Sequence, residues 1–476
     1  MHSDPLLTEF DRLLRRQPDH PIILGRSGSL TLAELDVASR QVAGLLHRQG
    51  VLPGTCICLR APNGSGFLAL FLGLLRHQAV PVLVDHQTPG AEVQRVMTAL
   101  NTGGLITCAT PWPVSPQDFT FQSDTNKTPA DTSTAPRRLS GPAVVKLTSG
   151  STGEARGIEV PVEALLTDEE NLAATMGIVD SDRLLAAVPL AHSYGLSSLV
   201  VPALVRGATL LVPEVRNPFA PLQMAAELEA TVFPTTPSYL DGLVRLEGDL
   251  LPVESLRVVI SAGAPLSPET AQRLRDAWGR SVHAFYGASE CGGIAYDREG
   301  GAAEEGLIGE PVRNVQIDLE EVPGIPGSGH RVLVRSDAVA RGYLPERDDH
   351  LKDGCFTSED LGSLQDGKLR LHGRLGAAVK IRGRKVHPAE VEQILVSMPG
   401  VEQAHVHAVP GRTKEQCTLE ALVVPVDSDM SRSEIIAWCR QYLAPEKVPR
   451  RVVLLESLPR NERGKIDTRK IQRPRG

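Results

Sequence analysis

The segment LTSGSTGEARG, residues 147–157, has the composition of a phosphate-binding loop. It contains three glycines, four hydroxyl side chains and one basic residue, Arg156, within eleven positions. Glycines let backbone N–H groups converge on an anion, and hydroxyl groups add donors without bulk. The GxxxxGK[ST] order of a Walker loop is missing, so the segment is a different kind of phosphate site. We expect it to hold phosphate; a surface loop without a ligand is the alternative.

Four further segments follow in an order that resembles the motifs of the adenylate-forming (AMP-binding) superfamily. This superfamily contains acyl-CoA synthetases, firefly-type luciferases and the adenylation domains of peptide synthetases. Together with the loop, the similarity runs from about residue 30 to about residue 470, and it is nearest to members that activate acyl and aryl acids. The four segments are AFYGASECGG (284–293), CFTSEDLGSL (355–364), GRLGAAVKIRGRKVHPAEVE (373–392) and LPRNERGKIDTRKI (458–471).

The resemblance implies a site for ATP and Mg²⁺. Tyr286, beside Gly287, would stack on adenine, and Ser289 would touch the α-phosphate. Glu290 would hold Mg²⁺ together with Thr152, and a hard carboxylate oxygen suits that ion. The loop residues that would hold the polyphosphate are Thr148, Ser149, Gly150, Ser151, Thr152, Gly153 and Arg156.

The resemblance also implies residues for the ribose and for the acyl acceptor. Asp360 would accept hydrogen bonds from both ribose hydroxyls, a task for a two-oxygen acceptor. Arg374 would reach ribose or phosphate oxygens. Gly383 lies on the loop expected to approach the pantetheine arm of CoA or of a carrier protein, and a solvated basic hairpin over 380–385 is the alternative.

Lys465 is the expected catalytic residue, because Gly464 and Ile466–Asp467 flank it as in the family. A long cationic side chain can meet the α-phosphate and the attacking carboxylate as negative charge redistributes. His192, in PLAHSYGL (189–196), resembles the histidine that acyl- and aryl-activating members place near the carboxylate. It would guide the acid or the incoming thiol, and a buried structural histidine is the alternative.

Four positions depart from the family pattern. Ser289 replaces a threonine, and Arg156 replaces the commoner lysine but keeps the charge and allows a bidentate grip on phosphate. Glu359 stands where a glycine is usual, which puts the local turn geometry in doubt. Gly376 stands where Asp or Lys is common, and glycine there can absorb large backbone changes.

The substrate is expected to be a fatty or aryl acid rather than an amino acid. No acidic residue occurs from Pro189 to Gly195, where amino-acid-activating members usually carry an aspartate for the ammonium group. A buried ammonium group without a partner would be costly. The expected pocket walls, Thr235–Leu240, Ala262–Ala264 and Gly287–Ser289, have small or moderately apolar side chains.

Alternating strand and helix patterns indicate an α/β fold with a doubly wound sheet. Thr31 is expected to cap a helix over 32–49, residues 110–141 form an irregular connection, and a strand is expected over 183–190. We expect a large N-terminal domain of mixed sheets with helices, residues 1–372. A small mobile α+β C-terminal domain, residues 373–476, follows a hinge near 373–378.

In the C-terminal domain a strand is expected over 378–386, then a helix with Pro388 in its first turn. Two further strands precede a second helix, which Ser431 and Glu434 should cap as a capping box.

The net charge of −7 is unevenly distributed: residues 373–476 carry 19 Lys/Arg against 12 Asp/Glu. Since interleaved aromatics and nucleic-acid motifs are missing, a basic domain that closes over polyphosphate fits better than nucleic-acid binding. The seven cysteines form no CxxC pair, which disfavours zinc and disulfide frameworks. No signal peptide or transmembrane segment is evident, so a cytoplasmic protein is expected.

These observations predict an ATP-dependent ligase with two half-reactions. A carboxylic acid attacks MgATP to form an acyl-adenylate and pyrophosphate, and the acyl group then passes to a thiol. The thiol belongs to CoA or to the phosphopantetheine of an acyl carrier protein acting in trans. The alternatives are a stand-alone amino-acid adenylation enzyme and a non-catalytic nucleotide- or acyl-binding homologue, with a luciferase-like oxygenase as a minor possibility.

Overall fold

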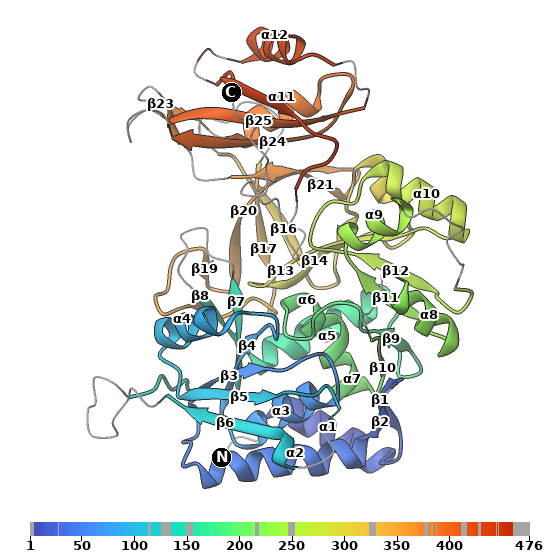
Figure 1. Ribbon diagram of the computed structural model, residues 1–476, viewed down its shortest axis with the longest axis vertical. Helices are drawn as coiled ribbons and strands as arrows, with labels where there is room; N and C mark the ends of the chain where they lie inside the picture. The colour runs from blue at the N-terminus through green and yellow to red at the C-terminus, as the bar shows by residue number, and fades with distance from the viewer. Residues whose placement is uncertain are drawn as a thin grey trace. The chain divides into compact units, whose positions relative to one another are not determined.

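The chain forms two compact units, which are described separately. Its computed structural model describes residues 4–26, 28–112, 116–124, 135–148, 156–214, 219–245, 253–322, 330–375, 379–381, 384–386, 388–410, 417–426, 430–443, 445 and 447–459. The first unit comprises Met1–Gln316 and Val334–Phe356, and the second comprises Ile317–Leu333 and Thr357–Gly476 (Figure 1). The boundary at 372/373 and the hinge remain predictions.

One sheet of the first unit has the strand order β18-β8-β7-β4-β3-β5-β6. Its inner strands β7, β4, β3 and β5 run parallel, and antiparallel strands extend it at both edges. The inner strands are rich in Val, Ile and Leu because both faces are covered. The strands are β3 (Cys56–Arg60), β4 (Val80–Val84), β5 (Gly104–Cys108), β6 (Phe119–Ser123), β7 (Ala143–Thr148), β8 (Arg156–Pro161) and β18 (Gly342–Leu344).

The other large sheet has the order β15-β14-β13-β12-β11-β9-β10-β1-β2. The six central strands pair in parallel, in the order β13-β12-β11-β9-β10-β1. The strands β2, β14 and β15 pair in antiparallel fashion. The strands are β1 (Pro21–Gly25), β2 (Gly28–Thr31), β9 (Arg183–Leu185), β10 (Thr209–Val212), β11 (Val232–Thr235), β12 (Val258–Ser261), β13 (His283–Ala288), β14 (Gly292–Tyr296) and β15 (Glu310–Pro311). The predicted α/β fold with mixed sheets is therefore confirmed.

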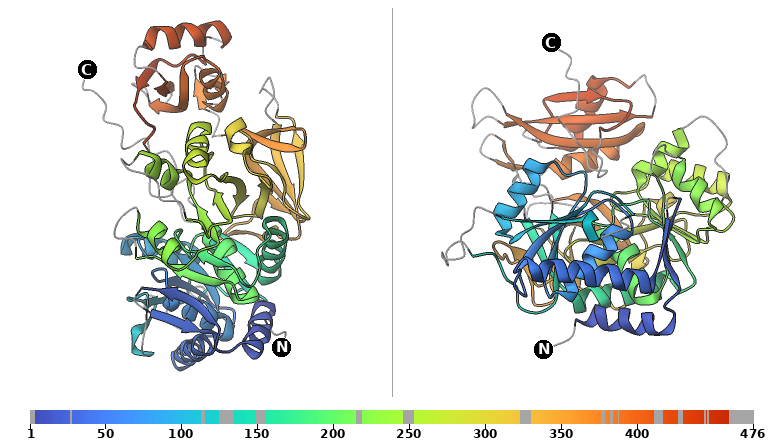
Figure 2. Two further views of the ribbon diagram at one scale, coloured as in Figure 1. Left: turned by 90° about the vertical axis from the view of Figure 1, so that its right-hand side faces the viewer. Right: turned by 60° about the horizontal axis from the view of Figure 1, so that its bottom comes forward.

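Helices, coloured blue to yellow-green in Figure 2, lie against these sheets. α3 (Ser65–Arg76) is buried from Ser65 to Leu75 and packs against β3, β4 and β5. α2 begins at Leu32 with the predicted Thr31 cap, whose side chain accepts from Glu34 N while Glu34 accepts from Thr31 N. Besides α3, the helical segments of the first unit are α1 (Pro5–Arg16), α2 (Leu32–Arg48), α4 (Gly90–Leu100), η1 (Pro116–Asp118), α5 (Val162–Met176), α6 (Ser193–Gly195), η2 (Leu196–Val200), α7 (Val201–Arg206), α8 (Ala220–Glu227), α9 (Pro237–Arg245), α10 (Pro268–Trp278) and η3 (Ala302–Glu305), among the described residues.

Two predicted segments differ from the structure. The connection 110–141 contains η1 and β6, and β6 pairs along its whole length with β5 and forms the edge strand of the sheet. The strand expected over 183–190 ends at Leu185, and residues 186–190 lead instead into the segment that carries His192.

Strands β16, β17, β20, β19 and β21 form a further sheet, in which β21 pairs with β20. The division between the two units falls within β16, β17 and β20. Their bounds are β16 (Gln316–Glu320), β17 (His330–Arg335), β19 (Leu351–Lys352), β20 (Cys355–Gln365) and β21 (Lys368–Arg374).

The C-terminal part of the second unit is a small α+β fold. Two helices pack against the sheet β24-β25-β26, and the predicted capping box of Ser431 and Glu434 is present. The single strand expected over 378–386 is instead two short strands, Val379–Ile381 and Arg384–Val386, which pair in antiparallel fashion. The elements are β22 (Val379–Ile381), β23 (Arg384–Val386), α11 (Pro388–Val396), β24 (Val401–Pro410), β25 (Cys417–Pro425), α12 (Arg432–Tyr442) and β26 (Arg451–Leu454).

Candidate active site

The two ends of the expected phosphate loop lie side by side. β7 and β8 pair in antiparallel fashion, and their last aligned pair is Thr148 opposite Arg156. The hairpin register therefore presents a hydroxyl and a guanidinium group at the same edge of the sheet. The loop residues between them, Ser149, Gly150, Ser151, Thr152 and Gly153, lie outside the described residues.

Arg156 contacts two residues that the sequence analysis did not identify. Its guanidinium group donates to Asp348 Oδ2 at 2.6 Å and lies 4.1 Å from the ring centroid of Tyr343. Burial alone would raise the pKa of Asp348, but the hydrogen bonds from Arg156 and from His350 N, together with the nearby positive charge of Arg156, lower the pKa overall. A charge-assisted bond and a cation–π contact thus hold the guanidinium group beside Thr148.

The second motif turns at the end of β13. Tyr286 and Gly287 are the β13 residues opposite Ala295 and Gly293 of β14, and a register shift separates them. Ser289 and Glu290 occupy the turn between these strands. The turn ends at Gly292, whose φ of +73° favours glycine. A Cβ atom at this position would lie 2.2 Å from Asp168 Oδ1, so a larger residue would clash.

Glu290 is joined to Arg156 through Tyr343. The Tyr343 hydroxyl donates to Glu290 Oε1 at 3.0 Å, while the face of the same ring receives Arg156. Burial, then the nearby Glu290 carboxylate, raises the pKa of Tyr343, so the phenol stays protonated as a donor. No local pattern distinguishes Tyr343, because it reaches the site only through the pairing of β18 with β8.

A buried pair of opposite charges, Lys146 and Asp168, underlies the Glu290 turn. Both residues are 3% exposed, and Asp168 Oδ1 accepts from Gly293 N at 2.9 Å. Burial lowers the pKa of Lys146 and raises that of Asp168, and the opposite charge of the other partly offsets each shift. This carboxylate therefore fixes the backbone three residues after Glu290.

His192 is paired with an aspartate from a distant strand. Its Nε2 lies 2.6 Å from Oδ2 of Asp85, the residue after β4. Burial alone would raise the pKa of Asp85, but the hydrogen bonds from His192 and from Gln87 N outweigh it and lower the pKa to about 2. His192 thus takes part in a histidine–carboxylate contact that the sequence did not reveal.

The His192 segment is tied to the Glu290 turn. Ser193 Oγ lies 2.5 Å from Ser289 Oγ. Upstream, Asn63 accepts from Leu190 N at 2.9 Å and donates to Val188 O at 2.9 Å. Gly195 permits the tight entry into α6, because a Cβ there would lie 2.1 Å from Pro189 O.

The ribose-motif residues belong to the second unit. Asp360 of β20 lies opposite Arg374 of β21, and Arg374 Nε is 3.7 Å from Asp360 Oδ1 and 3.5 Å from Glu359 Oε2. Asp360 N donates to Ser358 Oγ at 2.8 Å. Glu359 is part of β20, with a side chain 51% exposed, so a non-glycine residue fits this position in an extended strand.

Other predicted site residues lie outside the described residues. These are Lys465, Gly383 and the hinge residue Gly376, together with Thr152, the second expected Mg²⁺ ligand. Among the residues that the structure describes, no cluster of three or more His, Cys, Asp or Glu side chains could hold a metal. Of the two expected Mg²⁺ ligands, the structure describes Glu290, whose carboxylate suits that ion.

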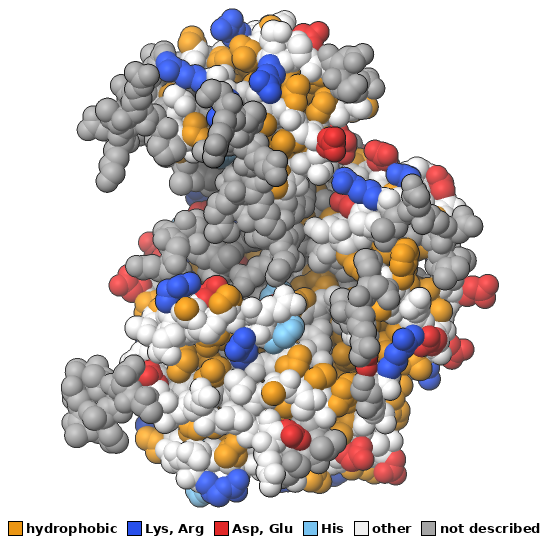
Figure 3. Space-filling model, viewed as in Figure 1, with side chains coloured by type: hydrophobic (Ala, Val, Ile, Leu, Met, Phe, Trp, Pro, Cys, Tyr) orange, Lys and Arg blue, Asp and Glu red, His pale blue; other side chains and the backbone are white. Residues whose placement is uncertain are grey.

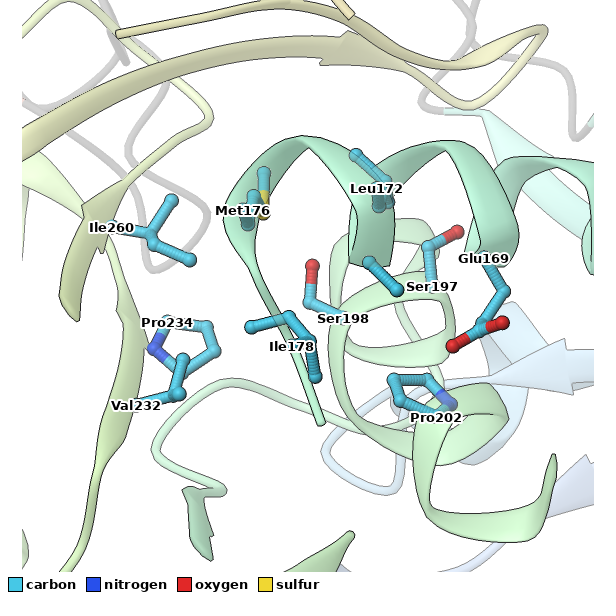
Figure 4. Close-up of a pocket in the computed structure, with 11 residues that line it drawn as sticks. Glu169, Leu172, Met176, Ile178, Ser197, Ser198, Pro202, Val232, Pro234 and Ile260 are labelled. Atoms are coloured by element: carbon cyan, nitrogen blue, oxygen red, sulfur yellow. The ribbon is translucent and has the colours of Figure 1, made fainter. Parts of the chain in front are cut away.

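A small cavity lies between α5, η2 and the strands β11 and β12 (Figure 4). Its volume is about 10 Å³, room for about one water molecule. Ser198, Val232, Pro234 and Ile260 are among the lining residues. None of the residues expected to wall the acid pocket lines this cavity, and its volume is too small for a substrate acid.

The chain matches known proteins over almost its whole length. The AMP-binding enzyme family matches residues 10–344, and the AMP-binding enzyme C-terminal domain family matches residues 390–465. A feruloyl-CoA synthase of an Amycolatopsis species is 28% identical over 486 residues, covering 97% of both chains. The long-chain-fatty-acid–CoA ligase FadD13 of Mycobacterium tuberculosis is 26% identical over 464 residues, covering 92% of this chain and 91% of the relative.

A similar fold is found in solved structures. The O-succinylbenzoate CoA synthetase of Bacillus subtilis in complex with AMP has a TM-score of 0.76 at 22% identity, covering 100% of this chain and 99% of that one. In the described part of the chain, no helix has the length and apolar character that crossing a membrane requires. On the face shown in Figure 3, acidic and basic side chains are interspersed.

Proposed function

Because the chain belongs to the AMP-binding enzyme family and is an ATP-dependent, AMP-forming acid–CoA ligase, we propose that its substrate is an aryl or fatty acid. The predictions of the family and of the ligase activity are confirmed. The proposal concerns the identity of the acid, the roles of the individual residues and the use of Mg²⁺. The relatives named for feruloyl-CoA and long-chain acyl-CoA support both acid classes.

One arrangement carries the proposal. Tyr343 contacts both Arg156 and Glu290. Ser289, which precedes Glu290, contacts Ser193, which follows His192. The residues expected to bind phosphate are thus connected, through these contacts, to the residue expected to lie near the carboxylate of the acid and the acyl acceptor. An acid and the α-phosphate must meet in such a place for adenylation.

The acid itself is inferred from the charges around His192. Asp85 is an acidic residue close to this segment, but its Oδ2 is engaged by His192 and its Oδ1 by Gln87 N. An amino-acid substrate would need a carboxylate free to pair with its ammonium group. An acid without an amino group therefore fits better, and an amino-acid adenylation enzyme remains the alternative.

In the proposed adenylation step, an oxygen of the acid attacks the α-phosphorus of ATP and pyrophosphate leaves. Arg156 and the loop hold the polyphosphate, Asp360 holds the ribose, and Lys465 meets the charge that develops on the α-phosphate. Mg²⁺, when bound by Glu290 and Thr152, would neutralise phosphate charge. Tyr343 orients Glu290 by its hydrogen bond. The acyl group then passes to the thiol of CoA, or to a carrier protein in trans.

The proposal is tested by ATP–pyrophosphate exchange with a panel of aryl, fatty and amino acids. We expect exchange with one aryl or fatty class and at least a 100-fold loss in Lys465→Ala and Arg156→Ala. Arg12→Ala, at an exposed ion pair of α1, is the matched control and should retain wild-type exchange. Exchange with amino acids alone would contradict the assigned acid class, and ATP binding without any exchange would favour a non-catalytic protein.

A further inference from the structure

Asp85 and His192 come together from segments far apart in the chain. Asp85 follows the parallel strand β4, and His192 directly precedes α6. The Nε2–Oδ2 distance is 2.6 Å, and the side chains of Asp85 and His192 are 12% and 32% exposed respectively. The carboxylate is therefore largely shielded, whereas the imidazole side chain is partly exposed.

Both residues are held in place by backbone contacts. Gln87 N donates to Asp85 Oδ1 at 2.8 Å, and Arg60 Nε donates to His86 O at 3.1 Å. Asn63 fixes Leu190, and Ser193 meets Ser289. The geometry of the pair is therefore set by the fold on both sides.

The contact determines which ring nitrogen carries a proton. Asp85 is ionised throughout the neutral range, because its pKa is about 2. An ionised carboxylate accepts a hydrogen bond and donates none, so it holds a proton on Nε2 of His192. When the imidazole is neutral, Nδ1 is then a proton acceptor. Other charged or titratable groups on the adjoining segments include His86, Arg60, Tyr194, Glu290 and Cys291.

We propose that His192 is the general base of the acyl-transfer half-reaction and that Asp85 is the residue that positions it. This inference rests on the proposed ligase function. His192 Nδ1 takes the proton of the acceptor thiol as sulfur forms its bond to the carbonyl carbon of the acyl-adenylate. The bond from that carbon to the phosphate oxygen breaks, AMP leaves with the electron pair, and the imidazolium later releases its proton to water. The carboxylate of Asp85 stabilises the imidazolium in between.

The test separates the two half-reactions. Adenylation is followed by pyrophosphate exchange, and transfer is followed in single turnovers of supplied feruloyl-adenylate and dodecanoyl-adenylate with CoA. In His192→Ala we expect transfer of the supplied adenylates to fall about 100-fold near pH 7, a much larger loss than that of exchange measured at saturating acid. In Asp85→Asn we expect a smaller loss of transfer, about 10-fold, and partial recovery in Asp85→Glu.

The pH profile distinguishes a base from a structural histidine. Transfer by the wild type and by His192→Ala is measured across the pH range with the same supplied adenylates. The defect of His192→Ala should shrink as the pH approaches about 8.5, where a thiol ionises without help. His405→Ala, which breaks a histidine–carboxylate contact of 2.8 Å in the second unit, is the control and should follow the wild-type profile.

Equal losses of exchange and transfer in His192→Ala, or a defect independent of pH, would overturn the inference. Normal transfer in that variant would overturn it as well, while the proposed function would stand. If the wild-type protein neither exchanges pyrophosphate nor uses either adenylate, the proposed function itself fails.

Discussion

The two units each contain a histidine paired with a carboxylate, in different surroundings. In the first unit, His192 and Asp85 meet beyond the ends of their secondary-structure elements at 2.6 Å. In the second unit, His407 of β24 lies opposite Glu420 of β25, with 3.2 Å between Nε2 and Oε2. Arg451 of β26 contacts the same glutamate at 3.1 Å, so the three side chains form a row across the sheet.

The difference between the pairs lies in the backbone around them. Glu420 is 1% exposed in the middle of a sheet, and its two neighbours, His407 and Arg451, belong to the adjacent strands. Such a row is part of strand pairing. Asp85 instead follows the carboxyl end of a parallel strand, where α/β proteins bind ligands. We therefore expect the row to act on stability alone, whereas the Asp85–His192 pair also takes part in chemistry.

Removing the central charge of the row should lower the stability of the protein. Glu420→Gln removes the charge that faces His407 and Arg451, and we expect a loss of about 2 kcal/mol in the free energy of unfolding. The full cost of breaking a buried pair is reduced because Arg451 is 44% exposed. Urea unfolding of the full chain measures it, with the exposed Glu402→Gln of β24 as control. A change below about 0.5 kcal/mol would remove the contrast between the pairs.

Acid should affect the other pair through Asp85. Its pKa is about 2 in the folded protein, against an ordinary value of 3.8, so the stabilisation is present above pH 4 and lost as the pH falls towards 2. The shift corresponds to about 2 kcal/mol. Unfolding measured from pH 5 to pH 2 should show this loss in wild type and in the exposed control Asp19→Asn, but not in Asp85→Asn. An identical acid limb in Asp85→Asn would contradict the assignment.

Tyr343→Phe should alter chemistry with little effect on stability. The variant keeps the ring beside Arg156 and removes the hydroxyl that donates to Glu290. Loss of this bond, about 1 kcal/mol, should raise the Mg²⁺ concentration for half-maximal pyrophosphate exchange about fivefold. Tyr442→Phe, at the exposed end of α12, should not change it. An unaltered Mg²⁺ dependence in Tyr343→Phe would mean that this hydrogen bond does not orient Glu290.

The smallest effect should come from the capping box of α12. Ser431→Ala removes the acceptor for Glu434 N and should cost about 0.5–1 kcal/mol of unfolding free energy. Pyrophosphate exchange should be unchanged, because the cap acts on the second unit's helix alone. Ser397→Ala, an exposed serine bonded to Ile394 O, is the matched control. A loss of exchange without a loss of stability would show that this part of the chain takes part in chemistry.

Much of the fold could be read from local patterns. Strand–helix alternation predicted the parallel sheets, and Thr31-x-x-Glu34 and Ser431-x-x-Glu434 predicted two helix starts that the structure contains. The ends of strands were harder to predict from the sequence. The run 183–190 is largely apolar, but only its first three residues form a strand. An apolar run indicates burial, whereas pairing depends on which neighbour is present.

By itself, the sequence determined the residue types of the motifs and their order, because a loop, a turn or a cap is encoded within a few consecutive residues. It determined Arg156, Ser289, Glu290 and His192 as candidates in this way. Only the tertiary structure decided their partners: Asp85 for His192, and Tyr343 for both Arg156 and Glu290. Those contacts join residues 53 to 187 positions apart, and they arise from the order in which strands pair, which no local pattern records.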